Sequence, residues 1–594
     1  MKKYILFLGI SLLAGSCMNN DFLEVYPQDK QTELTAFRTY DNFKAYTWGL
    51  YNTFNGYGKD WNNNSTYNGD FQADNMISHV AGNESQWGWQ TVKVPAQSDN
   101  WNYSYIRRVN LMLGNIDQSD MSDTEKEHWR SVGYFFRSYK YFDMLSRFGD
   151  IPWVDRVLSD DDDLLYAPRD SRDVVASNIL DDLKYAEEHI KKDGDGQNTI
   201  NKSVVQALIS RFALFEGTWR KYHSLSDAEK YLKECERVSS VLVNEYPILH
   251  PRYEELFNME DLSGVDGVLL FKAYAATQMV HGLTRSVRTG ESTMEVSKDA
   301  VDSYLCSDGR PIGSSPLYGG DKDVYAQFRN RDHRLYHTVC PPYQVKVATN
   351  SSVWDYTDNS VEREYIDLMA TISGPTYHNL PTANFKGFVT RGQPHFKGNN
   401  WGMGWQTTYM GFWFWKYYNT HTDATGAVNT TDAPLFRMGE IMLNYAEVKA
   451  ELGTFDQAVA DASINKLRAR AGVAPMTVAD INAGFDPARD PDVSPLLWEI
   501  RRERRVELFG EGFRFDDLRR WKKAAYINKQ PVGVYVGDGS TAPSPGASGK
   551  VTDEGYAYIF NPPKGWQEHY YLYPLPLNQL ALNKNLKQNS DWDN

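Results

Sequence analysis

The chain contains little cysteine, with only four among its 594 residues. Cys235, Cys306 and Cys340 are widely separated, so neither a disulfide framework nor the spacing of a zinc site is present. We therefore expect buried free thiols at these three positions. A single disulfide among them stays open as an alternative for a protein outside the cytoplasm.

Long apolar runs and an excess of positive charge are also missing. The apolar run Tyr4–Leu13 is too short to span a bilayer, which takes about 20 residues. The formal net charge is −14, and a nucleic-acid partner would require a basic face. Aromatic residues make up 14% of the chain, whereas long disordered segments are poor in them. These features indicate a folded protein that neither binds nucleic acid nor spans a membrane.

The N-terminus has the features of a targeting segment. Two lysines precede the apolar run, and the small residues Ala14–Ser16 lead directly to Cys17. This arrangement is similar to the lipobox of bacterial lipoproteins, although Ala14 stands where that pattern usually has Leu. We expect a signal peptide over residues 1–16, lipidation of Cys17, a tether over 17–40 and one domain over 41–594. An ordinary secretory signal is the alternative.

Motifs of catalysis and cofactor binding are incomplete. Gly549–Lys550 lacks the Ser or Thr that completes a phosphate-binding loop. His333 and His337 have the spacing of a zinc-binding helix, but Arg334 replaces the required Glu. The acidic run Asp160–Asp163 is interpreted as a solvated loop, with adventitious or structural calcium as the alternative. The sequence therefore predicts no enzyme and no cofactor.

Apolar residues at helical spacing predict a mainly α fold. Several predicted helices form pairs that resemble tetratricopeptide units, within about 130–242 and 434–523. A loop-rich insert over about 243–430 separates these two groups, and a second irregular region spans 525–570. The expected helices cover residues 40–54, 101–116, 130–148, 171–190, 201–219, 227–242, 434–452, 455–470, 495–510 and 513–523.

Residues 499–520 interleave arginines with nearly as many carboxylates. This balance predicts salt-bridged structure instead of a site for phosphate. The spacing of three residues places Glu499 near Arg502 and Arg504 near Glu507 on one helix.

Aromatic residues are abundant: 17 Trp, 38 Tyr and 27 Phe. Several tryptophans lie among Asn, Gln, Gly and Asp in predicted loops: Trp61, Trp87, Trp89, Trp354, Trp401 and Trp405. Flat rings suit the C–H face of a sugar, and amides or carboxylates suit its hydroxyls, so exposed rings on loops indicate glycan capture. Core packing is the alternative for each ring. The run Gly411–Tyr418 is interpreted as a strand with alternate burial.

Several motifs occur in an order that resembles one known family. They are Asp21-Phe22-Leu23-Glu24, residues 136–139, Phe148-Gly149-Asp150-Ile151-Pro152, Ser307-Asp308-Gly309, residues 330–334, residues 437–447, residues 503–508 with Gly512, residues 514–521, Pro574-Leu575-Pro576 and residues 585–589. This set resembles the SusD/RagB family of Bacteroidetes outer-membrane lipoproteins. Gly439 departs from the pattern, which usually has Ala there.

The resemblance implies a SusD-like fold, in which four tetratricopeptide-like pairs support an irregular, ligand-binding loop region. It implies a lipid-anchored protein on the outer surface of the outer membrane. Such a protein captures oligosaccharide or polysaccharide and delivers it to a SusC-type TonB-dependent transporter, without chemistry of its own. A peptide-binding uptake lipoprotein and a secreted glycoside hydrolase are the alternatives.

The resemblance also suggests, by position alone, which residues contact the glycan. These are Trp87, Trp89, Tyr274, His281, Arg285, Tyr343 and Trp354.

Overall fold

The structure is a computed structural model that describes residues 36–58, 68–78, 85–288, 294–346, 355–374, 378–382, 392–397, 407–421, 428–546 and 549–592. The predicted signal peptide, Cys17 and most of the predicted tether lie outside the described residues. Trp61, Trp354, Trp401 and Trp405 lie outside them as well.

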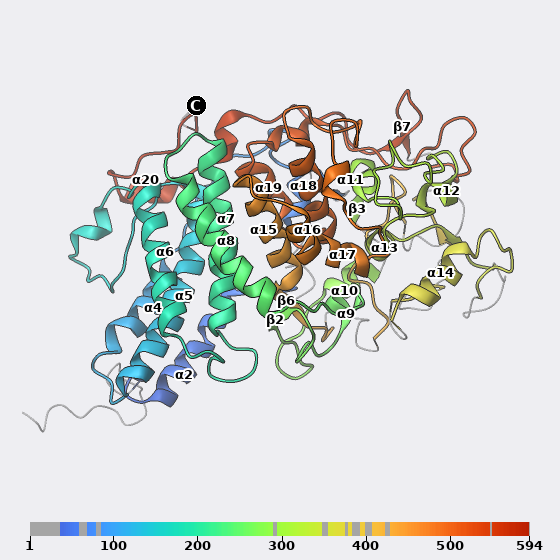
Figure 1. The fold of residues 1–594 in the computed structure, drawn as a ribbon. Coiled ribbons are helices and arrows are strands. Elements are labelled where there is room, and N and C mark those ends of the chain that lie inside the picture. Colours follow the sequence, from blue (N-terminus) through green and yellow to red (C-terminus); the bar gives the residue numbers. More distant parts are fainter. Residues whose placement is uncertain are drawn as a thin grey trace, which may run out of the picture.

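Helical pairs form one side and the middle of the molecule, and the loop-rich insert forms the other side (Figure 1). Two helices precede the pairs: α2 (Tyr40–Trp48) and α4 (Ser104–Asn115). The paired helices are α5 (Asp123–Phe148) with α6 (Arg172–His189), α7 (Lys202–Tyr222) with α8 (Ala228–Glu245), α15 (Met438–Glu451) with α16 (Gln457–Ala462) and α17 (Ile464–Arg470), and α18 (Pro495–Glu507) with α19 (Arg514–Arg520). The prediction of a mainly α fold is confirmed.

The ends of several helices differ from the predicted ends for local reasons. Helix α5 starts seven residues early, at Asp123, because Ser122 and Glu125 form a capping box there. The prediction of a single helix over 455–470 is wrong, because α16 and α17 are separate helices. Ser463 between them has a non-helical backbone, and its hydroxyl donates to the carbonyl of Val459 (2.5 Å). Helix α15 begins only at Met438, because the preceding residues are in a strand.

The insert and the loops around it consist of short elements. The helices of the insert are α9 (Glu255–Asn258), α10 (Leu283–Arg288), α11 (Lys298–Ser303), α12 (Val324–Phe328), α13 (His333–Thr338) and α14 (Glu364–Ile372). Outside the insert, α3 (Asn68–Phe71) lies between α2 and α4, and α20 (Leu577–Leu582) lies near the C-terminus. Antiparallel strand pairs are β1 (Met76–Ser78) with β3 (Met294–Val296), β2 (Val268–Lys272) with β6 (Ala433–Arg437), β4 (Tyr343–Gln344) with β5 (Gly392–Gln393), and β7 (Lys550–Val551) with β8 (Ala557–Tyr558).

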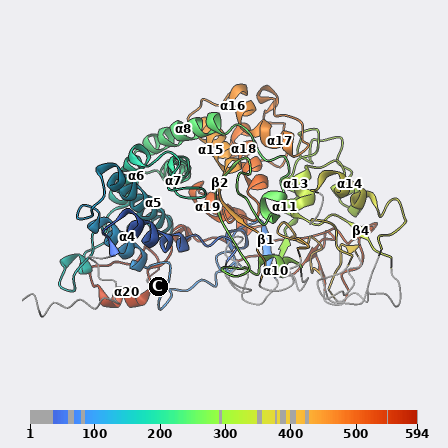
Figure 2. The ribbon, with the colours of Figure 1, turned by 90° about the horizontal axis from the view of Figure 1, so that it is seen from below.

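The insert has a hydrophobic core of its own, built largely from aromatic rings. All residues of Gly411–Tyr418 are buried, so the expected alternation of burial is wrong. The reason is contact on two sides: Trp413 forms a β-bridge with Glu295 of β3, and Phe414 forms one with Val339 directly after α13. Figure 2 shows the insert from below, beside the helical pairs.

A buried ion network joins the insert to the helical pairs. Glu507, at the end of α18, has no solvent exposure and pairs with Arg334 of α13 (2.9 Å), Arg437 of β6 (2.6 Å) and Arg470 of α17 (2.6 Å). Burial opposes ionisation, but these guanidinium groups hold the pKa of Glu507 far below its usual value. Arg334 also binds Glu503 (2.6 Å).

The network confirms the prediction of salt-bridged structure over residues 499–520, with one change of partner. The predicted pair of Glu499 and Arg502 is present, at 3.2 Å. The predicted pair of Arg504 and Glu507 is wrong, because Arg504 binds Asp517 of α19 (2.8 Å). Contacts between helices thus take precedence over the spacing within one helix.

Buried neutral histidines make stability dependent on pH. Burial lowers the pKa of His281, His337 and His378 to about 3, so each binds a proton near pH 6.5 only when the chain unfolds. Their contribution to the free energy of unfolding is complete above pH 6.5 and is lost as pH falls. The loss is about 2 kcal/mol for each histidine at pH 5. Asp70 and Asp432 act in the opposite sense, since burial raises both pKa values to about 6.

We therefore expect a net loss of a few kcal/mol of unfolding free energy between pH 7 and pH 5, because the two carboxyl groups offset only about 1 kcal/mol each. Thermal melts at pH 7, 6 and 5 check this expectation. An unchanged or rising melting temperature towards pH 5 would contradict it.

Two further expectations concern thiols and membranes. Cys235, Cys306 and Cys340 are buried and free, which confirms the prediction of free thiols and excludes the disulfide alternative in this structure. Among the described residues, no helix combines the length and the apolar character needed to cross a bilayer.

Candidate functional site

A cavity of about 230 Å³ lies where three distant segments meet: the turn at residues 85–90, the start of α11, and residues 526–532. The β1–β3 pair places α11 beside the first segment. Ser297 caps α11 by accepting from the Ala300 amide and donates to the Asp74 carbonyl (2.7 Å). The Lys298 amide donates to the Val532 carbonyl (2.7 Å), which positions the third segment.

Trp89 lines this cavity with a partly exposed side chain. The indole Nε1 donates to the Asn561 carbonyl (3.1 Å), and the edge of Phe560 contacts the ring at a centroid distance of 5.6 Å. The backbone amide of Trp89 donates to the Ser85 carbonyl (3.1 Å). These contacts fix the orientation of the ring while part of its surface stays accessible.

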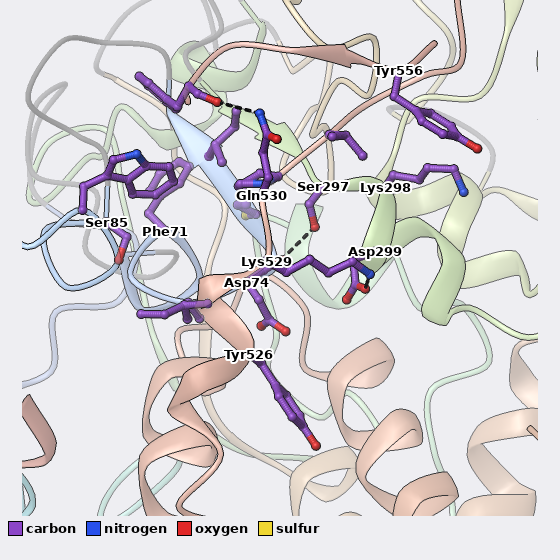
Figure 3. Close-up of a pocket in the computed structure, with 18 of the residues that line it drawn as sticks. Phe71, Asp74, Ser85, Ser297, Lys298, Asp299, Tyr526, Lys529, Gln530 and Tyr556 are labelled. Carbon is purple, nitrogen blue, oxygen red and sulfur yellow. Dashed lines mark hydrogen bonds and ion pairs between the residues drawn. The ribbon is translucent and has the colours of Figure 1, made fainter. Parts of the chain in front are cut away.

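Polar and charged side chains form part of the cavity wall (Figure 3). Lys529 pairs with Asp299, and Lys298 pairs with Asp302 at 2.6 Å. Gln530 donates to the Phe560 carbonyl (3.1 Å). The charges in the wall are therefore largely compensated by one another, and the wall offers both donors and acceptors.

The carboxylates of the wall differ in their environment. Burial opposes ionisation of Asp299, but Arg505 and Lys529 hold its pKa below the usual range. Burial raises the pKa of Asp302, with Lys298 acting against it. The Oδ1 atom of Asp302 is buried without a hydrogen-bond partner.

Trp87 lies two residues before Trp89 in the sequence but is absent from the cavity lining. It is 1% exposed, and its ring packs against Tyr573 (4.8 Å between centroids) and Phe515 (5.7 Å). The expectation of an exposed ring at Trp87 is corrected: the side chain belongs to a hydrophobic cluster between the C-terminal segment and α19.

Tyr274 and His281 lie together but are buried. Their rings meet edge to face at 4.7 Å, with exposures of 5% and 0%. The Tyr274 hydroxyl donates to the Gly58 carbonyl (2.9 Å), and Nε2 of His281 is 3.1 Å from the Thr431 carbonyl. The structure thus corrects the expectation that these two side chains face a ligand.

The remaining predicted residues are dispersed. Arg285 lies on α10 and is half-buried. Tyr343 of β4 is fully buried and donates to the Pro381 carbonyl (2.7 Å). Trp354 and Cys17 lie outside the described residues. Of the predicted glycan-contacting residues, only Trp89 lines the cavity described here.

The sequence reasoning missed the third segment and its aromatic neighbours. Tyr526, Tyr556 and Phe560 line the cavity, and all three come from the irregular region 525–570. That region combines aromatic residues with Gly, Pro and Lys, the pattern that had drawn attention to the earlier loops. The same criterion would have included these three rings.

Metal binding has no geometric support in the described part of the chain. No three His, Cys, Asp or Glu side chains there are placed to hold a metal ion. His333 and His337, which have the spacing of a zinc-binding helix, are not part of such a group. Burial lowers the pKa of both side chains, and His337 lies 3.5 Å from Glu254.

The fold and the chain's sequence define a class of protein. Residues 273–592, more than half of the chain, match the model of the SusD family, and the chain belongs to that family. Residues 21–214 match a second model, described as starch-binding and associating with the outer membrane. The resemblance stated from the sequence motifs is thus confirmed.

Relatives extend this assignment over nearly the whole chain. "SusD-like protein P2" of Formosa agariphila is 20% identical over 494 residues, which cover 82% of this chain and 78% of that protein. A SusD-like carbohydrate-binding protein of Bacteroides fragilis superposes with a TM-score of 0.67 at 20% identity, over 93% of this chain and 100% of its own. Surface glycan-binding protein A of Bacteroides fluxus gives 0.58 at 15% identity, over 93% and 100%. These similarities establish the shared SusD-like fold.

Proposed function

We propose that this protein captures oligosaccharide or polysaccharide at the cell surface and passes it to a SusC-type TonB-dependent transporter. The Trp89 cavity carries the proposal, because it combines an accessible, fixed ring with oriented donors and acceptors. Such a combination suits a sugar, whose ring has an apolar face and a rim of hydroxyls. Membership of the SusD family supports the proposal, and two structural relatives are named for carbohydrate or glycan binding.

The proposed capture involves no bond breaking and no cofactor. Glycoside hydrolysis by two carboxyl groups needs one that keeps its proton at neutral pH. Asp74 and Asp299 in the cavity wall are ion-paired with arginines, and both pKa values are lowered despite burial. Neither can therefore act as the general acid. Asp302, whose pKa burial raises, is the one wall carboxyl group described here for which product analysis has to test that role.

The proposed location is the outer face of the outer membrane, with acyl chains on Cys17 as the anchor. The lipobox-like segment supports the anchor, and the second family model, whose description includes association with the outer membrane, supports the membrane. It would place the Trp89 cavity where extracellular glycans are available.

A glycan panel with product analysis tests the proposal. We expect protein that begins after Cys17 to bind at least one polysaccharide of plant, algal, host or microbial origin and to leave its chain length unchanged in chromatography. Shortened products would indicate a hydrolase. Binding of peptides with no binding of any glycan would indicate the peptide-uptake alternative.

A further inference from the structure

A second and larger cavity, of about 500 Å³, lies between the helical pairs and the start of the insert. An adjoining cavity of about 250 Å³ shares part of the same wall, and we call the two together the central cleft. The residues that line both are Tyr139 of α5, Arg211 of α7, and Glu511, Gly512, Phe513 and Asp516 at α19. Its volume falls within the range of small-molecule sites, roughly 300–1,000 Å³.

The central cleft is separate from the Trp89 cavity. Residues 71–74 form a partition between them: Gln72 lines the central cleft, whereas Phe71, Ala73 and Asp74 line the Trp89 cavity. Asp516 in the cleft wall has 49% of its side chain exposed, so the cleft is open to solvent. A small ligand can therefore reach it without passing the first site.

Two tyrosine hydroxyls in the cleft are available to a ligand. Tyr57 and Tyr417 also line the cleft, but their hydroxyls donate to the carbonyls of Phe257 (3.3 Å) and Gly510 (2.8 Å). Tyr139 and Tyr573 line the cleft and are partly exposed, and within the described residues no protein group forms a hydrogen bond with either hydroxyl. These two hydroxyls therefore face the open volume.

The charges of the cleft are balanced by close pairs. Arg211 binds Glu440 through both carboxylate oxygens (2.6 and 2.7 Å), and Arg437 binds Glu511 (2.7 Å). Arg147 binds Asp143 (2.9 Å), at the edge of the cleft. A charged ligand would have to compete with these pairs, whereas a neutral hydroxylated ligand would not.

We propose that the central cleft is a second binding site, which takes a neutral monosaccharide or the terminal residue of a neutral glycan. Partly exposed rings of Tyr139, Phe513 and Tyr573 would contact the apolar face of the sugar. The two tyrosine hydroxyls would contact its hydroxyl groups. The inference rests on the wall of the cleft and does not depend on Trp89, so the two sites can be tested separately.

Ligand-observed NMR with methyl α-D-glucopyranoside, methyl α-D-mannopyranoside and methyl β-D-galactopyranoside tests this site, with glucuronic acid as the charged comparison. The double variant Tyr139→Phe/Tyr573→Phe removes only the two hydroxyls, so its melting temperature should equal that of the wild type. Trp89→Ala removes the ring of the first site, so binding to this variant reports on the central cleft. We expect at least one neutral glycoside to bind Trp89→Ala, and to bind about tenfold or more weakly when the two tyrosine substitutions are added to it.

Equal affinity of Trp89→Ala with and without the two tyrosine substitutions would overturn the proposal, and so would absence of binding by all three neutral glycosides or tighter binding of glucuronic acid. Loss of monosaccharide binding in Trp89→Ala alone would also overturn it, while supporting the Trp89 cavity. A crystal soaked with the bound glycoside should show density beside Tyr139 and Tyr573.

Discussion

Replacing Glu507 by glutamine is expected to destabilise the fold by about 3–5 kcal/mol, the cost of removing one partner of a buried ion pair. Glutamine keeps the shape of the side chain but leaves three buried guanidinium groups without its charge. Arg334 and Arg437 retain other carboxylates, Glu503 and Glu511. Arg470 pairs with no other carboxylate among the described residues, so its charge becomes uncompensated.

Chemical unfolding, followed by circular dichroism and by tryptophan fluorescence, measures this effect. Glu229→Gln is the matched control, because Glu229 forms an exposed pair with Lys233 on α8 and such pairs contribute little. We expect no measurable change in the control. Equal midpoints for Glu507→Gln and wild type would show that the network does not stabilise the contact between insert and helical pairs.

Trp89→Ala is expected to weaken glycan binding by about 2 kcal/mol or more, roughly 30-fold, as for tryptophans at the centre of other binding sites. The indole provides an accessible flat ring whose orientation is fixed by its hydrogen bond, and alanine removes that ring. Titration calorimetry with the best-binding glycan of the panel measures the loss.

Trp48→Ala provides the matched control for this experiment. Trp48 is 50% exposed on α2 and does not line the Trp89 cavity, so its removal should leave affinity unchanged. If both variants bind as tightly as the wild type, the Trp89 cavity is not the glycan site. If both lose affinity equally, the effect is not specific to the cavity.

The helical part of this fold could be predicted from sequence because its signals are local. Apolar residues at helical spacing, together with Gly149 and Gly453 at helix ends, place the pairs correctly. The exceptions are local as well, such as the side-chain bond of Ser463 that divides α16 from α17. Partners of charged groups were harder to predict, since Arg504 selects a carboxylate on the next helix.

Burial of the loop aromatics could not be predicted from their neighbours. Trp87 lies in a polar stretch, yet it packs against Phe515 and Tyr573, more than 400 residues away in sequence. Tyr274 and His281 are likewise covered, in part by the ring of Tyr57, about 220 residues earlier in the chain. Composition shows that rings are present in loops, but only the tertiary contacts decide which of them, such as Trp89, keep an accessible surface.

A crystal structure of the protein with its best-binding oligosaccharide tests the central claim most directly. The account predicts intact glycan in the Trp89 cavity, with a sugar ring against the indole and a hydroxyl within hydrogen-bond distance of a polar group of the cavity wall. A cleaved glycan, or an intact one bound where it contacts neither Trp89 nor the wall of its cavity, would contradict the account.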